Sequence, residues 1–254
     1  MAEAPLLSVR GLARSFYGVR ALAGADFDVA AGTITALIGP NGAGKTTAFQ
    51  CISGVVPPDG GQVLFAGRDV TGWSAERISR AGLVRTFQIA RGIPRLSVLE
   101  NLLLYAKDQP GEEMWAALIG GGRAAAKRAL ARALAIARRL DLISVANQAA
   151  GALSGGQKKL LEIGRALMAE PRLVLLDEPI AGVNPTLAER IAEHLRSLRD
   201  EGITFLVIEH HMDLIARLCE PVIVMAEGRT LRTGRFAEIA ADEAVQLAYL
   251  GMRT

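Results

Sequence analysis

The segment that most constrains this chain is residues 39–47, which read Gly-Pro-Asn-Gly-Ala-Gly-Lys-Thr-Thr. They fit the pattern Gly-x-x-x-x-Gly-Lys-[Ser/Thr]. In this pattern the backbone N–H groups of a glycine-rich turn point at phosphate oxygens, and the lysine neutralises the phosphate charge. The segment therefore predicts a phosphate-binding loop.

The residues on both sides of this loop support that prediction. Residues 33–38 form a short apolar, β-prone run, and residues 46–52 can continue as a helix, so we expect strand, loop and helix in succession. The positive end of that helix would face the phosphates. The alternative is an ordinary glycine-rich turn with a solvated lysine.

Within the loop, Lys45 is expected to reach the β- and γ-phosphates and Thr46 to coordinate magnesium through its hydroxyl, while glycines let the backbone approach closely. The residues expected to contact the nucleotide here are Gly39, Asn41, Gly42, Gly44, Lys45, Thr46 and Thr47.

Two acids follow another apolar run, residues 173–176, and an acid at the tip of a buried parallel strand faces the ligand crevice. We expect Asp177 to hold magnesium and Glu178 to orient and polarise the attacking water. The pair could instead cap the next helix. That is disfavoured because Pro179 follows and the next helix is expected to start near Pro185.

A further motif, Leu-Ser-Gly-Gly-Gln at residues 153–157, matches the signature of ABC transporters. With it, the chain resembles the nucleotide-binding subunit of that family over essentially its full length. The resemblance implies an α/β fold of the P-loop NTPase, ABC type, with an N-terminal antiparallel β region, an inserted α-helical subdomain, and ATP and Mg²⁺ as cofactors. In the family the signature of one subunit closes over ATP held by another, which assigns nucleotide contacts to Ser154, Gly155, Gly156 and Gln157. A plain helix N-cap is the structural alternative for the serine.

Three more positions take their roles from the same resemblance. Gln88, in Arg-Thr-Phe-Gln, would contact magnesium and sense the γ-phosphate. His210 would contact the γ-phosphate, although its neighbour His211 stands where relatives more often carry aspartate. Phe16 is preferred to Tyr17 for stacking on adenine.

Several stretches resemble the branched-chain amino acid importers in particular. They are Ala-Gly-Val-Asn-Pro at 181–185 and residues 85–88, 98–102, 161–165 and 248–251. An extra segment between Tyr105 and Leu140 resembles the insertion in one of the two unequal ATPase subunits of those importers.

The implied partners are a second, distinct ABC ATPase subunit, two transmembrane permease subunits and, through them, a solute-binding protein. The cargo would be branched-chain amino acids or a similar small polar solute. The alternatives are a lipid or lipopolysaccharide exporter ATPase, a soluble ABC ATPase acting on nucleic acid or ribosomes, and a nucleotide-gated scaffold without turnover.

We expect one ABC ATPase domain over residues 1–254, with the nucleotide-binding core and β region in 1–88 and 151–254 and the helical subdomain in 89–150. Mechanical coupling to the membrane subunits is placed in residues 89–101. A basic amphipathic helix is expected around Lys127 and Arg128, with Leu130, Leu134, Ala137 and Leu140 on its apolar face. The preferred interpretation of its basic face is a solvated surface, and the alternative is a contact with lipid headgroups or with a permease subunit.

Composition fits an intracellular nucleotide enzyme. The chain has 254 residues, 50% hydrophobic and 5% aromatic, so it can bury a sizeable core but offers few stacking residues for single-stranded nucleic acid. The 2 cysteines suggest a reducing compartment. No apolar run approaches the roughly 20 residues of a membrane helix, and the N-terminus lacks signal-peptide features. We therefore expect a peripheral protein on the cytoplasmic face of the cell membrane, with no nucleic-acid partner.

Overall fold

The computed structural model describes residues 4–86, 93–107 and 122–250. They form two compact units. The first contains the chain up to Arg85, Arg172–Pro179 and the chain from Leu195 onward, and the second contains Thr86–Pro171 and Ile180–His194. Residues 155–168, which the sequence analysis assigned to the nucleotide-binding core, belong to the helical second unit.

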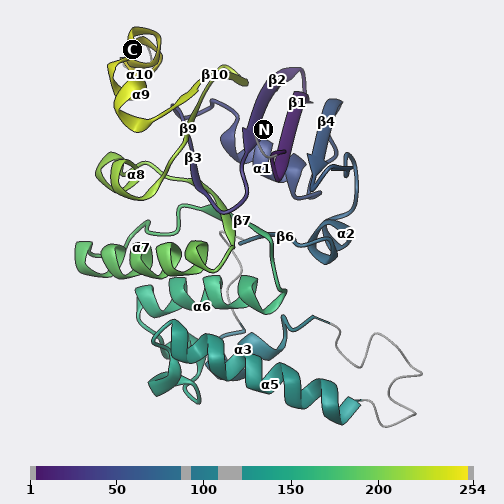
Figure 1. Ribbon diagram of the computed structural model, residues 1–254, viewed down its shortest axis with the longest axis vertical. Coiled ribbons are helices and arrows are strands. Elements are labelled where there is room, and N and C mark those ends of the chain that lie inside the picture. Colours follow the sequence, from purple (N-terminus) through teal and green to yellow (C-terminus); the bar gives the residue numbers. More distant parts are fainter. Residues whose placement is uncertain (1–3, 87–92, 108–121, 251–254) are drawn as a thin grey trace. The chain divides into compact units, whose positions relative to one another are not determined.

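The first unit contains a four-stranded antiparallel sheet, visible at the purple end of the chain in Figure 1. Its strands are β1 (Leu7–Phe16), β2 (Val19–Val29), β4 (Gly60–Phe65) and β5 (Arg68–Asp69), in the order β2-β1-β4-β5. Tyr17 and Gly18 connect β1 to β2, and both have positive φ, 49° and 85°. A two-residue turn of this kind matches the twist of the strands it joins.

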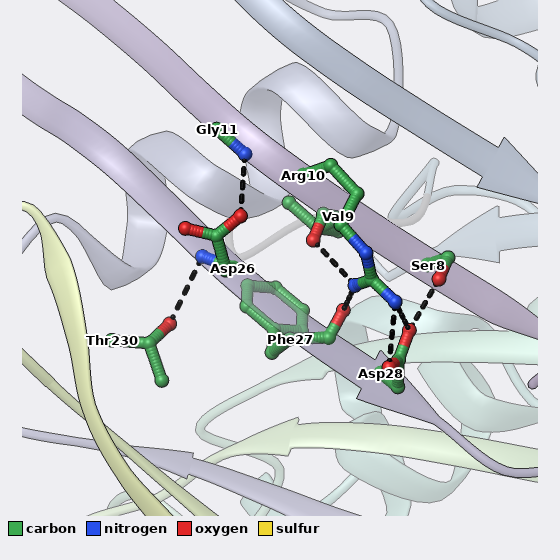
Figure 2. A network of polar contacts seen from close by, with 8 residues as sticks. All are labelled: Ser8, Val9, Arg10, Gly11, Asp26, Phe27, Asp28 and Thr230. Atoms are coloured by element: carbon green, nitrogen blue, oxygen red, sulfur yellow. Dashed lines mark hydrogen bonds and ion pairs between the residues drawn. The ribbon is translucent and has the colours of Figure 1, made fainter.

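Polar contacts along the β1–β2 pair fix its register (Figure 2). The Arg10 guanidinium donates to both carboxylate oxygens of Asp28 at 2.7 Å, and the Ser8 hydroxyl donates to the same carboxylate. Asp26 accepts from the Gly11 amide at 2.8 Å, and its own amide donates to the Thr230 hydroxyl at 3.3 Å. The network ties the antiparallel sheet to the last strand of the second sheet.

The second sheet has six strands in the order β10-β9-β3-β8-β7-β6. Its strands are β3 (Ile34–Ile38), β6 (Leu83–Arg85), β7 (Leu173–Asp177), β8 (Thr204–Ile208), β9 (Val222–Ala226) and β10 (Arg229–Gly234). All pairs are parallel except β9–β10. Every residue of β3, β7 and β8 is buried, which is why these strands read as unbroken apolar runs rather than alternating ones.

Among the described residues, five helices lie wholly within the first unit: α1 (Lys45–Ile52), α2 (Ala75–Arg80), α8 (Met212–Leu218), α9 (Phe236–Ala241) and α10 (Glu243–Leu250). Phe49 and Ile52 of α1 are fully buried in the same apolar core as Leu37 of β3 and Leu206 of β8. The core therefore fixes the helix and the strand on either side of the glycine-rich loop.

The second unit is helical, with α3 (Val98–Leu103), α5 (Gly122–Arg139), α6 (Gly155–Met168) and the 3₁₀ turns η1 (Ile143–Val145) and η2 (Ala150–Ala152). The helix α7 (Pro185–Asp200) begins in the second unit and ends in the first. A side chain at Gly164 of α6 would lie 2.9 Å from Leu102 of α3 and 3.2 Å from Leu140, so glycine permits the close approach that Figure 1 shows for α3, α5 and α6.

The α/β fold with an antiparallel β region and a helical part is confirmed. The helix start at Pro185 and the strand at 204–208 are also confirmed. Of the expected apolar face, Ala137 of α5 and Leu140 just beyond its end are buried and Leu134 is half-buried, whereas Leu130 is exposed. Ala133 and Ile136 are the other buried residues of this stripe. No helix in the three described ranges is both long enough and apolar enough to cross a membrane.

Candidate nucleotide-binding site

The glycine-rich loop follows β3 and leads into α1, as the strand–loop–helix prediction required. Gly39 has φ of 147°, and a side chain there would lie 2.1 Å from the carbonyl oxygen of Met225 in β9. Gly44 has φ of 97°, and a side chain there would lie 2.5 Å from the carbonyl oxygen of Ala21. Both positions therefore require glycine twice over, for backbone conformation and for space.

Lys45 is the first residue of α1 and is buried, with 7% of its surface exposed. Its Nζ donates to the carbonyl oxygens of Gly39 at 2.6 Å and Pro40 at 2.9 Å. Burial lowers the pKa of Lys45, while the negative charges of Glu178 and Asp177 act in the opposite direction. The lysine thus lies within electrostatic reach of both strand-end acids.

The other polar residues of the loop are accessible. Asn41, Gly42 and Thr46 are exposed, and Thr47 is half-buried. Asn41 and Gly42 also border a pocket of about 260 Å³ whose wall includes Glu227 and Leu247. The loop therefore presents a polar, open surface, while Lys45 is buried and Gly39 and Gly44 pack closely against neighbouring backbone.

Asp177 ends β7, is almost completely buried and has a cationic partner. Arg85, the last residue of the neighbouring strand β6, donates from Nη2 to Asp177 Oδ2 at 3.1 Å. The two side chains are 8% and 3% exposed. Arg85 also lies over the ring of Phe49 at 5.9 Å from the centroid. A buried carboxylate at the strand tip is therefore paired with an adjacent, equally buried guanidinium.

Glu178 and His210 face each other at the ends of the adjacent strands β7 and β8. His210 Nε2 lies 3.2 Å from Glu178 Oε1, and both side chains are partly accessible, at 43% and 32%. Glu178 has φ of 50°, and its amide donates to the Ile208 carbonyl oxygen at 2.9 Å. The positive φ is uncommon for glutamate and turns its side chain at a place where the strand stops.

Glu209, which the sequence analysis did not single out, holds the histidine segment in place. Its carboxylate is 2% exposed, accepts from the His210 amide at 3.0 Å and lies 3.1 Å from His211 Nδ1. His211 is thus a partner of Glu209, whereas His210 is the histidine that meets Glu178. The sequence did offer one signal for this role, because the acidic residue stands directly before the two histidines.

Phe16 ends β1 and is half-buried, with the Arg14 guanidinium 4.9 Å from the centre of its ring. Tyr17, the alternative for adenine stacking, is fully exposed at the turn. Tyr249 of α10 adds an aromatic that the sequence analysis left without a role. Burial raises the pKa of its phenol, and the backbone amide of Gly39 acts in the opposite direction.

The signature residues belong to the second unit. Ser154 is the N-cap of α6, where its hydroxyl accepts from the Gln157 amide at 3.3 Å and Gln157 Oε1 accepts from the Ser154 amide at 2.9 Å. This reciprocal capping box satisfies two helix-end donors and leaves Ser154 and Gly155 exposed. Gly156 is buried, and a side chain there would collide with Leu187 of α7 at 1.7 Å.

The structure therefore brings Lys45, Asp177, Glu178 and His210 together in the first unit and presents Ser154–Gln157 on the second. Gln88, the predicted sensor of the γ-phosphate, lies outside the described residues. A glycine-rich loop at a helix N-terminus, with a lysine and two acids at the carboxyl ends of parallel strands, can bind a phosphate chain and polarise a water. This arrangement defines a nucleotide-binding protein of the P-loop class.

Comparison with known proteins identifies the family. A family profile described as "ABC transporter" matches residues 22–181. Two similar proteins are named as branched-chain amino acid transport ATP-binding proteins LivG. The one from Archaeoglobus fulgidus is 38% identical, over 97% of this chain and 95% of that protein. The one from Escherichia coli K12 is 37% identical, over 97% of this chain and 98% of that protein.

Solved structures agree with these sequence matches. A nucleotide-free ATP-binding cassette from an ABC transporter superposes with a TM-score of 0.85 at 35% identity, covering 96% of this chain and 98% of that one. An ATP-binding cassette of an ABC transporter in its ADP conformation superposes with a TM-score of 0.84 at 34% identity, covering 98% of this chain and 100% of that one. The chain belongs to the ABC transporter family, as an ATP-binding ATPase subunit.

Proposed function

We propose that this chain is the ATP-hydrolysing subunit of an importer for branched-chain amino acids or a similar small polar solute. The observation that carries the proposal is the similarity, across 97% of the chain, to proteins named for that transport. The grouping of Lys45, Asp177, Glu178 and His210 in one compact unit supports ATP hydrolysis as its activity.

In this proposal the loop amides and Lys45 bind the phosphate chain, and Phe16 stacks on adenine. Lys45 is already fixed by two carbonyl oxygens, so little side-chain freedom is lost when phosphate oxygens take their place. Asn41, Gly42, Thr46 and Thr47 contribute from the accessible side of the loop. Gln88 is proposed to sense the γ-phosphate.

The residues present suit magnesium. The ion prefers hard oxygen ligands and usually combines one or two protein groups with phosphate oxygens and water. The Thr46 hydroxyl and the Asp177 carboxylate, with Gln88, supply that kind of donor. When bound, the ion would neutralise charge on the phosphates. Arg85 donates to one oxygen of the Asp177 carboxylate and so orients it at the strand end.

Glu178 is proposed to take the proton from the attacking water. Its carboxylate is accessible yet fixed, because the amide is bonded to Ile208 and Oε1 faces His210 Nε2. A general base must lie within hydrogen-bond reach of its proton and be held in the right direction. His210 supplies that hold and, on its other side, a contact for the γ-phosphate.

We further propose that both units work as one ATPase domain that pairs with a second, distinct ATPase subunit. Ser154, Gly155, Gly156 and Gln157 would then close over ATP held by the partner. Two permease subunits would hold the pair at the cytoplasmic face of the membrane and receive solute from a binding protein. The exposed serine at the N-terminus of α6 supports this, because helix N-termini favour anions.

The test uses Glu178→Gln with Glu193→Gln, an exposed glutamate on α7, as the matched control. Full-length protein is purified with its partners from gently solubilised membranes and reconstituted in vesicles. Glu178→Gln should keep ATP affinity but lose about 10²-fold or more in phosphate release, and leucine uptake should stop with it. The control should behave like the wild type.

Normal turnover in Glu178→Gln would refute the assigned role of that residue. The proposal that this chain serves an importer is tested separately, by mass spectrometry of the chains that co-purify with it. Two multi-spanning proteins and a second ATPase are expected. Recovery of nucleic-acid-binding proteins without membrane proteins would overturn the importer proposal but not the ATPase assignment.

A further inference from the structure

The second unit contains a buried polar network centred on Asn101 of α3. The Asn101 amide is 1% exposed. Its Nδ2 donates to the carbonyl oxygens of Ile93, Leu96 and Ser97 at 3.2, 3.1 and 2.9 Å, and its Oδ1 accepts from the Ile93 amide at 3.1 Å. One side chain thus makes four hydrogen bonds to the backbone of residues 93–97, in addition to the backbone amides that already donate to the carbonyl oxygens of Ile93, Leu96 and Ser97.

Arg165 of α6 completes the network. It is 4% exposed, and its Nη2 donates to Asn101 Oδ1 at 2.8 Å. Its guanidinium lies 5.6 Å from the centre of the Tyr105 ring. Burial lowers the pKa of Arg165, and interactions with Tyr105 and Glu162 oppose that shift. A guanidinium in so enclosed a place is costly, so its contacts with α3 hold the two helices in one relative position.

A second connection joins the same loop to the residues just before the signature. The amides of Ala150 and Gly151 donate to the carbonyl oxygens of Leu96 and Pro94, both at 2.9 Å. A side chain at Gly151 would lie 3.1 Å from Pro94, so the two segments are in close backbone contact. Leu153 and Ser154 follow directly along the chain.

We propose that Asn101 and Arg165 are positioning residues that lock the signature segment to residues 93–97. Those residues lie between Gln88 and α3 in the chain. They are fastened to the start of α6 through residues 150–151 and to its later turns through Asn101 and Arg165. A displacement of residues 93–97 therefore moves Ser154 with it. The consequence for turnover rests on the proposed function of Ser154, whereas the mechanical connection does not.

Two variants separate the halves of the network. Asn101→Asp keeps an oxygen for Arg165 but sets a carboxylate against three carbonyl oxygens, which breaks the loop connection. Arg165→Met keeps the bonds from Asn101 to the loop and removes the guanidinium. Lys158→Met, at an exposed position on α6, is the matched control. Arg165→Lys retains a charged donor as the conservative replacement.

Hydrogen exchange on the full chain without nucleotide measures the connection directly. We expect Asn101→Asp to accelerate exchange about tenfold at residues 93–97 and also at the amide of Gln157, near the start of α6. Arg165→Met should accelerate the amides of residues 150–151 as well as those near its own site. Acceleration confined to the mutated site in both variants would overturn the proposal. Should Asn101→Asp not fold, Arg165→Met and Arg165→Lys decide alone.

Turnover supplies a second measurement that a merely structural role would not produce. The P-loop belongs to the first unit, so ATP affinity of Arg165→Met should stay within about twofold of the wild type, while kcat falls about tenfold to hundredfold because Ser154 is misplaced. Arg165→Lys should recover part of kcat. If exchange is accelerated away from the mutated site but kcat is unchanged, the signature has no part in turnover, while the assignment of the nucleotide site is unaffected. Equal losses in ATP affinity and in kcat would overturn the positioning role.

Discussion

Charge at the candidate site is set by pairs of residues rather than by single side chains. Asp177 and Arg85 form a pair that is almost fully withdrawn from water. Removing one member of such a pair leaves an uncompensated buried charge, which costs more than the pair itself contributes. Lys45 lies near enough to Asp177 to offset part of that cost.

Arg85→Met should therefore lower the free energy of unfolding by about 3 kcal/mol, at the low end for a broken buried pair. Arg80→Met is the control, because Arg80 pairs with Glu76 at the surface, and it should change that free energy by less than about 1 kcal/mol. Urea denaturation of both variants measures the difference. Adding Asp177→Asn to Arg85→Met should restore part of the loss; no recovery would contradict the pairing argument.

The same residues show how far sequence could predict the site. The glycine-rich loop and the acids at 177–178 could be located because local spacing determines their geometry. The Arg85–Asp177 pair could not, because its members are 92 residues apart and meet only when β6 lies beside β7. Glu209 was missed although its partners His210 and His211 follow it directly in the chain, because its burial depends on tertiary packing. The burial of Tyr249 depends on tertiary packing in the same way.

At the scale of elements, the β1–β2 pair combines a tight turn with a charge network on its outer side (Figure 2). Burial alone would raise the pKa of Asp28, but hydrogen bonds from Arg10 and Ser8 outweigh it and the pKa lies below its ordinary value of 3.8. The folded state therefore binds this proton more weakly than the unfolded chain does. Its stabilising contribution is present above the ordinary pKa and is lost as pH falls through the lower folded value.

We accordingly expect Asp28→Asn to lower the melting temperature at pH 7. The difference in melting temperature between the variant and the wild type should shrink as the solution is acidified below about pH 4. Asp69→Asn is a useful comparison. Asp69 also has a lowered pKa, but its partners Gln62 and Thr71 are neutral, so added salt should weaken the effect at Asp28 more than at Asp69. A gap for Asp28→Asn that is constant with pH would contradict the assignment.

The helix α5 marks the limit of element-scale prediction. Its period of apolar residues correctly indicated an amphipathic helix, yet burial begins at Ala133 rather than at Leu130. Periodicity gives the direction of the apolar face. It does not give the length over which another helix covers that face, which depends on where α3 and α6 end.

At the scale of the whole molecule, both units are assembled from separate stretches of chain, and α7 runs through both. The central strand β3 pairs with β8 on one side and β9 on the other, and both come from the last quarter of the sequence. A chain ending at residue 200 therefore lacks every neighbour of β3, whereas one ending at residue 234 keeps all strands.

The shorter fragment should show no cooperative thermal transition and no ATP binding, because its P-loop strand has no sheet to join. The fragment that ends at residue 234 lacks only α9 and α10 among the described elements, so it should retain a cooperative transition at a lower temperature. Calorimetry and nucleotide titration distinguish the two. Cooperative melting of the shorter fragment would contradict this argument.

That strand order has a consequence for synthesis in the cell. Ile34 pairs with Phe205, so the ribosome must add about 170 residues before β3 finds its partner, a delay on the order of ten seconds. Throughout that time an apolar strand and the loop that follows it are available to chaperones and to other nascent chains. The earliest functional motif to be translated is thus among the last to be enclosed, and nucleotide can assist folding only near the end of translation.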